Sequence, residues 1–304
     1  MLRFSRYHPA PMFTGSITAL ATPFDAADEI DFSALESLVA HQLDNGTSAL
    51  VVAGTTGESA ALRAGEFDRL LQAVTGQVAG QIPVIAGTGS ASTDRTLEQT
   101  RRAASLRADA VLVVTPYYVR PPQTGLIAHF RAVADVSELP VILYNVPSRT
   151  SVDMLPETVA ELAGHDRIVA VKEAVGSMER VDALREQCTA DFVVLSGDDP
   201  TCFEAMRHGA RGVISVASNV APGLISELAA AAQGGDWAVA EECDARLRPL
   251  YDGLAVETNP IPVKWALQEM GLCDARLRLP LIALSQEHRS AMREALASLN
   301  LLRT

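Results

Sequence analysis

The sequence predicts an α/β fold, a (β/α)8 TIM barrel with a C-terminal helical appendage. Eight short β-branched runs recur along the chain, and segments with helical periodicity separate them. The remaining segment, 221–304, carries helical patterns and no strand signal. Strands and helices that alternate eight times favour a closed parallel barrel, and a chain of 304 residues is long enough to form one.

Each predicted strand is a continuous apolar run, as expected of parallel strands that are covered on both faces. The runs are Ser16–Leu20, Ser48–Gly54, Pro83–Gly87, Ala110–Thr115, Pro140–Asn145, Ile168–Lys172, Phe192–Gly197 and Gly212–Val216. A doubly wound open sheet is the structural alternative. It would normally place a Gly-x-Gly-x-x-Gly turn after the first strand, and the sequence there, ATPFDAADE, is not such a turn.

The intervals between the strands carry helix start and stop signals. Asp31 can cap a helix after the first strand, and Asn45-Gly46 can end it. Another interval has Pro156 near its start and Gly164 just past its end, the positions that these two residues favour around a helix. These signals support the alternation of strands and helices.

The chain divides into three predicted parts. Residues 12–220 form the barrel core, residues 221–304 form the last barrel helix and a helical region packed on the barrel as one structural unit, and residues 1–11 form a leader. Met12 is a candidate start of the protein. No apolar run approaches the roughly 18 residues that cross a bilayer, and the leader lacks the apolar stretch of a signal peptide. We therefore expect a cytoplasmic protein.

The composition indicates which partners, metal sites and disulfides to expect. A net charge of −12 argues against nucleic acid and anionic membranes, because both require a basic surface. The six histidines are scattered without ligand spacing, so we expect no protein-held metal. We expect reduced thiols, because the cysteines are widely spaced and form no Cys-x-x-Cys motif. They are Cys188, Cys202, Cys243 and Cys273.

Unusual local sequences follow the predicted strands, at the ends where a barrel places its active site. They are GTTGES (Gly54–Ser59), TPYY (Thr115–Tyr118), YNVPSRT (Tyr144–Thr150), Lys172 at the end of an apolar run, and SGDD (196–199). Each has an ordinary explanation on its own, such as a Gly-rich turn, wall tyrosines, a solvated arginine or a lysine that reaches water. Their convergence on one barrel mouth favours an active site.

Lys172 is the most informative of these residues because it ends a buried strand. A low-dielectric barrel disfavours the ammonium form, so a neutral amine becomes available to attack a ketone and form a Schiff base. The Schiff base is an electron sink that lets the neighbouring carbon become an enamine. Tyr144 can move protons, and Thr55 and Thr56 can hold a keto acid's carboxylate. For Glu173 we expect a partner at the strand end or a place at a helix start.

These motifs, together with GVISV (Gly212–Val216) and NPIPVKWA (Asn259–Ala266), resemble the dihydrodipicolinate synthase family in order and spacing over about residues 12–301. The Gly-x-Thr-Gly-Glu and Tyr-Asn-x-Pro motifs and the strand-end lysine also occur in the wider superfamily of pyruvate-dependent class I aldolases, which includes N-acetylneuraminate lyase. The second threonine of GTTGES, Arg149 in SRT, and NPIPVK are more specific to the synthase.

The resemblance implies a lyase that condenses pyruvate with L-aspartate 4-semialdehyde to 4-hydroxy-tetrahydrodipicolinate, the entry to the diaminopimelate branch of lysine biosynthesis. It implies no cofactor, because the intermediate is an imine between the lysine and pyruvate. Carried over by position, Lys172 forms the Schiff base, and Tyr144, Thr55 and Tyr118 form a proton relay. Tyr118 is implied to reach into a neighbouring subunit's site, in a homo-oligomer that is usually a tetramer built from two dimers.

The same resemblance implies the substrate-binding residues. Thr56 holds the pyruvate carboxylate together with backbone amides, and Ile214 contributes a backbone contact near pyruvate. Gly197 belongs to the same substrate-binding set. Arg149 at the mouth binds the carboxylate of the aldehyde substrate, a task that suits a bidentate guanidinium.

One departure from the family concerns feedback by lysine. Inhibited relatives bind lysine beside the site with an acidic residue, an amide and histidines. The corresponding positions here hold Arg95, Ala91, Ala64 and Phe67, whereas Ser59, Ala60 and Tyr117 match. A cationic Arg95, where the amino group of the ligand needs a carboxylate, should repel lysine, so we predict weak or absent inhibition.

Several alternatives share parts of this pattern. Another class I aldolase, cleaving N-acetylneuraminate or 2-keto-3-deoxygluconate, would share Lys172 and Tyr144 but needs polar groups for a polyol, whereas Arg149 suits a short carboxylated aldehyde. A non-catalytic barrel that binds keto acids would form no covalent adduct, and a metal-dependent aldolase would lose activity to chelators. A phosphosugar barrel normally carries a Gly-rich anion site where this sequence has Asp198-Asp199.

Overall fold

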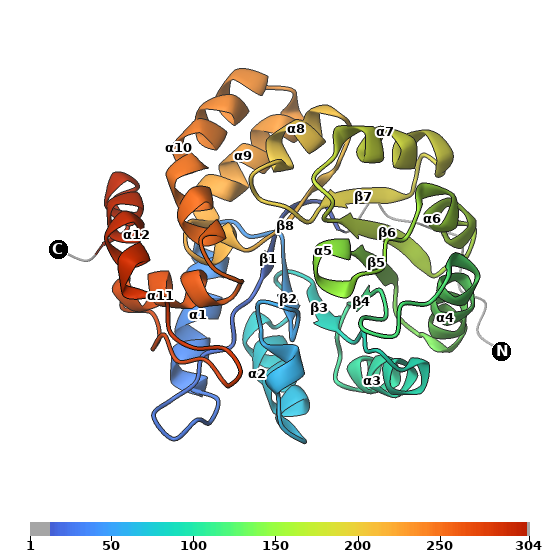
Figure 1. Cartoon of the computed structure of the whole chain (residues 1–304), viewed down its shortest axis with the longest axis horizontal. Coiled ribbons are helices and arrows are strands. Elements are labelled where there is room, and N and C mark those ends of the chain that lie inside the picture. Colours follow the sequence, from blue (N-terminus) through green and yellow to red (C-terminus); the bar gives the residue numbers. More distant parts are fainter. Residues whose placement is uncertain (1–12, 303–304) are drawn as a thin grey trace.

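The computed structural model describes residues 13–302, and within them eight parallel strands form a closed barrel in chain order. Figure 1 shows the strands at the centre of the molecule with helices around them. The strands are β1 (Gly15–Ala19), β2 (Ala49–Val52), β3 (Val84–Gly87), β4 (Ala110–Val114), β5 (Val141–Asn145), β6 (Ile168–Glu173), β7 (Val193–Ser196) and β8 (Gly212–Ser215). The predicted (β/α)8 barrel is confirmed.

Helices follow the strands in alternation and cover the outside of the barrel (Figure 1). Those up to β8 are α1 (Phe32–Asp44), η1 (Ser59–Ala61), α2 (Glu66–Val78), α3 (Thr93–Ser105), α4 (Gln123–Val136), α5 (Pro147–Thr150), α6 (Pro156–Ala163), α7 (Met178–Gln187) and α8 (Cys202–Arg207). After β8 come η2 (Ala217–Asn219), α9 (Pro222–Gly234), α10 (Trp237–Ala255), α11 (Ile261–Glu269) and α12 (Gln286–Ser298).

The predicted helix signals act where the sequence places them. The Asp31 carboxylate accepts a hydrogen bond from the backbone N–H of Ala34 at 2.9 Å and caps α1, and Asn45 is the C-cap of that helix. Pro156 is the first residue of α6, and Gly164 is its C-cap. The backbone groups at the end of a helix have no partner within the helix. Asp31 supplies a partner for one of them, and Pro156 has no N–H that would need one.

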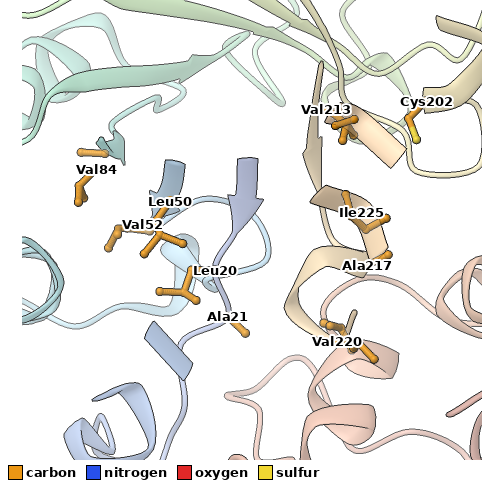
Figure 2. Packing of buried hydrophobic residues seen from close by; sticks show 14 of the residues in the cluster. Leu20, Ala21, Leu50, Val52, Val84, Cys202, Val213, Ala217, Val220 and Ile225 are labelled. Atoms are coloured by element: carbon orange, nitrogen blue, oxygen red, sulfur yellow. The ribbon is translucent and has the colours of Figure 1, made fainter. Parts of the chain in front are cut away.

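Side chains of each strand alternate between the barrel interior and the surrounding helices. In β2, Ala49 and Val51 belong to the apolar cluster inside the barrel, whereas Leu50 and Val52 belong to the larger cluster under the helices. Figure 2 shows Leu50 and Val52 in this outer cluster, with Ile225 of α9 among its helical members. Both faces of the strand are therefore apolar, which explains why each strand reads as a continuous hydrophobic run.

The segment after β8 is helical, as predicted. Helix α10 packs on α9 and also contacts α11 and α12, which lie together on one flank of the barrel (Figure 1). The division into residues 12–220 and 221–304 stays a prediction. The leader, 1–11, and Met12 lie outside the described residues. No helix among residues 13–302 is both long and apolar enough to cross a membrane.

Candidate active site

Strand β6 places Lys172 inside the mouth of the barrel. Side chains of β6 alternate, with Ala170 facing the interior and Val171 facing the helices, so Lys172 faces the interior. Only 5% of Lys172 is exposed. Its partner in the register of β5 is Tyr144, and the Lys172 Nζ lies 4.4 Å from the centroid of the Tyr144 ring. The structure therefore brings together the predicted nucleophile and the predicted acid/base.

Gly197 leaves the space that the Lys172 side chain occupies. A Cβ at position 197 would lie 2.9 Å from both Cγ and Cε of Lys172 and 2.8 Å from the Cβ of Ala174. The Gly197 N–H donates to the carbonyl of Glu173 at 2.7 Å and extends the pairing of β6 with β7 beyond the strand end. Gly197 thus lies against the lysine, as its predicted place in the site requires.

The loop after β2, residues 54–59, carries the two predicted threonines. Thr55 is half-buried and Thr56 is buried. The Thr56 hydroxyl accepts a hydrogen bond from the Asn259 side-chain amide at 3.0 Å. The Thr22 hydroxyl donates to the carbonyl of Gly57 at 2.8 Å, so the loop is held from two separate segments of the chain.

Ile214 and the SGDD segment form another part of the barrel mouth. Ile214 on β8 is buried in the interior cluster that also contains Tyr144. One oxygen of the Asp199 carboxylate accepts the backbone N–H groups of Val216 at 2.9 Å and Ala217 at 2.8 Å. Sequence reasoning missed this role of Asp199, because no local pattern tells which backbone N–H groups a loop carboxylate meets.

Arg149 and Tyr118 lie at the rim and are exposed. Arg149 lies on α5, and its guanidinium donates to the carbonyl of Asn259 at 3.3 Å. Tyr118 has 89% of its surface exposed and a φ of 71°, in the left-handed region. Within residues 13–302, no hydrogen bond joins the hydroxyls of Tyr144, Thr55 and Tyr118. The predicted relay is therefore not assembled in this chain, where Tyr144 is buried in the interior cluster and Tyr118 is exposed.

Glu173, next to Lys172, faces away from the barrel interior. The Asn145 side-chain amide donates to both oxygens of its carboxylate at 3.1 Å, and the Val175 N–H donates at 3.0 Å. Burial raises the pKa of Glu173 to about 7, while the hydrogen bond from Asn145 opposes this shift. Of the two predicted roles, the structure supports a partner at the strand end, because α7 begins only at Met178.

Lysine is rare in this chain and is never exposed. The sequence contains two lysines, Lys172 and Lys264, and both are buried. Lys264 on α11 is 0% exposed, and its Nζ donates to the Glu58 carboxylate at 2.7 Å. Lys172 is therefore the one lysine that lies at the mouth of the barrel.

Metal-ligating side chains and thiols are dispersed over the described part of the chain. Residues 13–302 contain no group of three or more His, Cys, Asp or Glu side chains that could hold a metal ion. The four cysteines are free thiols. Burial raises the pKa of Cys188 to about 11, so this thiol is a poor nucleophile near neutral pH.

Comparisons with known proteins place the chain among similar sequences. The model of the Dihydrodipicolinate synthetase family matches residues 12–299. The 4-hydroxy-tetrahydrodipicolinate synthase of Ectopseudomonas mendocina is 50% identical over 291 residues, which cover 96% of this chain and 100% of that protein.

Solved structures show the same similarity. The dihydrodipicolinate synthase of Aquifex aeolicus has a TM-score of 0.94 at 44% identity and covers 96% of this chain and 100% of its own. The chloride-inhibited enzyme of Acinetobacter baumannii, complexed with pyruvate, has a TM-score of 0.93 at 42% identity, with 95% and 99% covered. The chain belongs to the dihydrodipicolinate synthetase family.

Proposed function

We propose that this protein is a lyase that condenses pyruvate with L-aspartate 4-semialdehyde to 4-hydroxy-tetrahydrodipicolinate, the first step of the diaminopimelate branch of lysine biosynthesis. The observation that carries the proposal is the buried Lys172 facing Tyr144 in the barrel interior, in a chain 50% identical over its length to a 4-hydroxy-tetrahydrodipicolinate synthase. The reaction needs no cofactor, because the lysine supplies the electron sink as an imine.

The first half of the reaction activates pyruvate. The Lys172 Nζ attacks the C2 carbonyl, and the carbinolamine that forms loses water to give a protonated imine. Loss of a proton from the C3 methyl group then gives an enamine, whose C3 is a nucleophile. Tyr144, whose ring centroid lies 4.4 Å from the Lys172 Nζ, exchanges protons at the carbinolamine, and Thr55 and a Tyr118 hydroxyl pass them on.

Binding of both carboxylates orients this chemistry. Thr56 and the backbone N–H groups of its loop hold the pyruvate carboxylate, and Gly197 and Ile214 line the space around the lysine. Arg149, exposed at the rim, binds the carboxylate of aspartate 4-semialdehyde.

The second half joins the two substrates. The enamine C3 attacks the aldehyde carbon, and the aldehyde oxygen takes up a proton and becomes the hydroxyl of the product. The substrate's own amino group then attacks C2 of the imine, which breaks the bond to Lys172 and closes the ring. The lysine leaves as a free amine, so the protein ends the cycle unchanged.

We also propose a homo-oligomer, at least a dimer and by family resemblance a tetramer of two dimers. Its support is the position of Tyr118, which the relay requires but which is 89% exposed and makes no hydrogen bond to Tyr144 among residues 13–302. A tyrosine from a neighbouring copy would complete each relay.

Free lysine should be a weak ligand of this protein. Arg95 lies exposed on α3, where inhibited relatives carry the acidic residue that meets the amino group of lysine. Two cations that face each other repel, so the binding of lysine is disfavoured at this position.

Reductive trapping tests the proposal most directly. Purified protein is incubated with pyruvate and borohydride and then analysed by peptide mass spectrometry, and we expect a reduced pyruvate adduct on Lys172. The Lys172→Ala variant should form no adduct. The Arg149→Ala variant should form the adduct but condense it poorly with aspartate 4-semialdehyde. An unaltered wild-type mass would overturn the proposal.

A two-substrate assay separates this activity from that of related aldolases. Wild-type protein should consume pyruvate with aspartate 4-semialdehyde and should not cleave N-acetylneuraminate or 2-keto-3-deoxygluconate. Faster cleavage of either sugar acid would reassign the substrate and keep the Schiff-base chemistry.

A further inference from the structure

A buried cluster of charges ties the 54–59 loop to the C-terminal segment. The Lys264 Nζ donates to one oxygen of Glu58 at 2.7 Å, and these two side chains are 0% and 1% exposed. The other oxygen of Glu58 accepts the backbone N–H of Arg278 at 3.0 Å. Glu58 belongs to the loop that carries Thr55 and Thr56, whereas Lys264 and Arg278 lie more than 200 residues further along the chain.

A second ion pair and an aromatic ring complete the cluster. The Arg278 guanidinium donates two hydrogen bonds to Glu66, at 2.5 and 2.7 Å, and these side chains are 5% and 1% exposed. The ring of Phe24 has the Lys264 Nζ at 4.3 Å and the Arg278 Cζ at 4.1 Å from its centroid. Cations at these distances are attracted to the ring, which joins the segment after β1 to the cluster.

Stability alone is a weak explanation for this arrangement. Removing two charges from water carries a desolvation cost that their attraction often fails to offset, so apolar residues of similar volume are usually as stable or more stable. A buried ion pair does fix geometry, because its donors and acceptors have few alternative partners.

The backbone of Glu58 has an uncommon conformation. Its φ is +51°, in the left-handed region that side chains other than glycine seldom adopt, and its N–H donates to the carbonyl of Thr55 at 3.1 Å. The anchored side chain of Glu58 therefore holds the turn that orients Thr55 and Thr56. Asn259, two residues before α11, binds Thr56 directly at 3.0 Å, so the same C-terminal region contacts the loop at both Thr56 and Glu58.

We propose that Glu58 and Lys264 are positioning residues, and that their buried ion pair fixes the loop of Thr55 and Thr56 for the carboxylate of the keto acid. The C-terminal helical segment is thereby part of the pyruvate site, although no side chain of α11 is required to touch pyruvate. This inference rests on the proposed function, in which Thr56 holds that carboxylate.

Glu58→Gln tests the inference, with Glu66→Gln as the matched control. Both carboxylates are buried in the same cluster and both bind Arg278, but only Glu58 lies in the loop. A glutamine at position 58 retains one acceptor oxygen and cannot serve both Lys264 and the Arg278 N–H. The readout is the pyruvate concentration that gives half-maximal borohydride trapping on Lys172, measured beside the melting temperature.

We expect both variants to melt at a lower temperature than the wild type. In Glu58→Gln the half-maximal pyruvate concentration should rise at least about ten-fold, since small misplacements of binding groups are costly. The maximal adduct yield should stay close to that of the wild type, and Glu66→Gln should keep the wild-type pyruvate concentration within about two-fold, because its loop contacts remain. An unchanged pyruvate requirement in Glu58→Gln, or an equal rise in both variants, would overturn the inference.

A second variant covers the case in which Glu58→Gln does not fold. Glu58→Leu/Lys264→Met replaces the ion pair with apolar side chains and leaves neither partner as a buried unpaired charge. It should be more stable than Glu58→Gln and should still have a higher half-maximal pyruvate concentration than the wild type. A half-maximal pyruvate concentration equal to that of the wild type would contradict the inference. Absence of an adduct in the wild type itself would instead refute the proposed function.

Discussion

The side chain of Lys172 packs into space that exists only because residue 197 is a glycine. The Lys172 methylene groups fill the space that a Cβ at position 197 would need, at 2.9 Å from its ideal place. Contacts this short force a shift, and the Cβ of Ala174, at 2.8 Å from the same place, is a second short contact.

Gly197→Ala should therefore slow imine formation without unfolding the protein. Displacing the Nζ by a fraction of an ångström removes its alignment with the ketone, so we expect the trapping rate with pyruvate to fall by up to about 100-fold. Gly234→Ala is the control, because a Cβ there meets no atom within 4 Å. Equal trapping rates in the two variants would show that Lys172 tolerates the added methyl group.

Glu173 should make the stability of the protein depend on pH. Burial raises its pKa from 4.5 to about 7, so between these values the folded protein keeps a proton that the unfolded chain releases. Unfolding is then favoured as the pH rises through this window, and the loss of stability is complete above pH 7.

The Glu173→Gln variant lacks this titration, so its stability relative to the wild type should increase as the pH rises. The difference between their free energies of unfolding should grow by up to about 3 kcal/mol between pH 4.5 and pH 8, in urea denaturation. Glu186→Gln, which changes an exposed residue of α7, should differ from the wild type by a constant amount. A constant difference for Glu173→Gln as well would show that the carboxyl ionises alike in both states.

Sequence reasoning predicted the contact between Lys172 and Tyr144 because Lys172 breaks a local rule. Lys172 is a charged residue near the end of a buried strand, and Tyr144 lies on the strand before it, so neighbouring parallel strands were enough to predict their contact. The pair Lys264 and Glu58 was not predicted, because 206 residues separate its members. No local pattern specifies which buried carboxylate a buried lysine meets, since tertiary packing decides it.

At the scale of elements, helix α3 carries the predicted insensitivity to lysine. Arg95 is exposed on this helix and places a cation where the family resemblance expects a carboxylate. We expect no half-maximal inhibition of the condensation below millimolar lysine. An Arg95→Glu variant should bind lysine more tightly than the wild type in calorimetry. Strong inhibition of the wild type at micromolar lysine would contradict the prediction.

The elements also show where strand boundaries escape the sequence. The apolar run Ser48–Gly54 predicts a longer strand than the observed β2, Ala49–Val52. The strand ends early because Ala53 has a φ of 54° and turns the chain out of the sheet. Likewise the short helix α5, Pro147–Thr150, follows β5 directly and has no signal beyond its first proline. Backbone turns of this kind depend on contacts with other loops, which a single sequence does not display.

At the scale of the whole molecule, the order of the strands in the barrel was predictable from the sequence. The contacts between copies of the chain were not. Eight apolar runs with helices between them allow few parallel arrangements, and the closed barrel in chain order follows from short right-handed connections. Tyr118 is different, because 89% of its surface is exposed and its proposed place in the relay requires a second copy of the chain. Its assignment to a neighbouring site stays a prediction.

Mixing two inactive variants tests whether subunits share their sites. Lys172→Ala lacks the nucleophile, and Tyr118→Phe lacks the relay hydroxyl. In a mixed dimer, the site with an intact Lys172 receives an intact Tyr118 from the other chain. Activity should therefore reappear when the two proteins are dissociated and reassembled together. Each variant reassembled alone is the control, and no recovery in the mixture would place Tyr118 in its own chain's site or outside the reaction.

The scarcity and burial of lysine have a practical consequence for chemical labelling. Both lysines of the folded chain are buried, so amine-directed reagents such as succinimidyl esters meet no lysine on its surface. Modification of Lys264 then requires local opening around α11, whereas protection of Lys172 by a keto acid reports occupancy of the barrel mouth. Two side chains in one labelling experiment thus act as separate reporters, one of conformational opening and one of ligand.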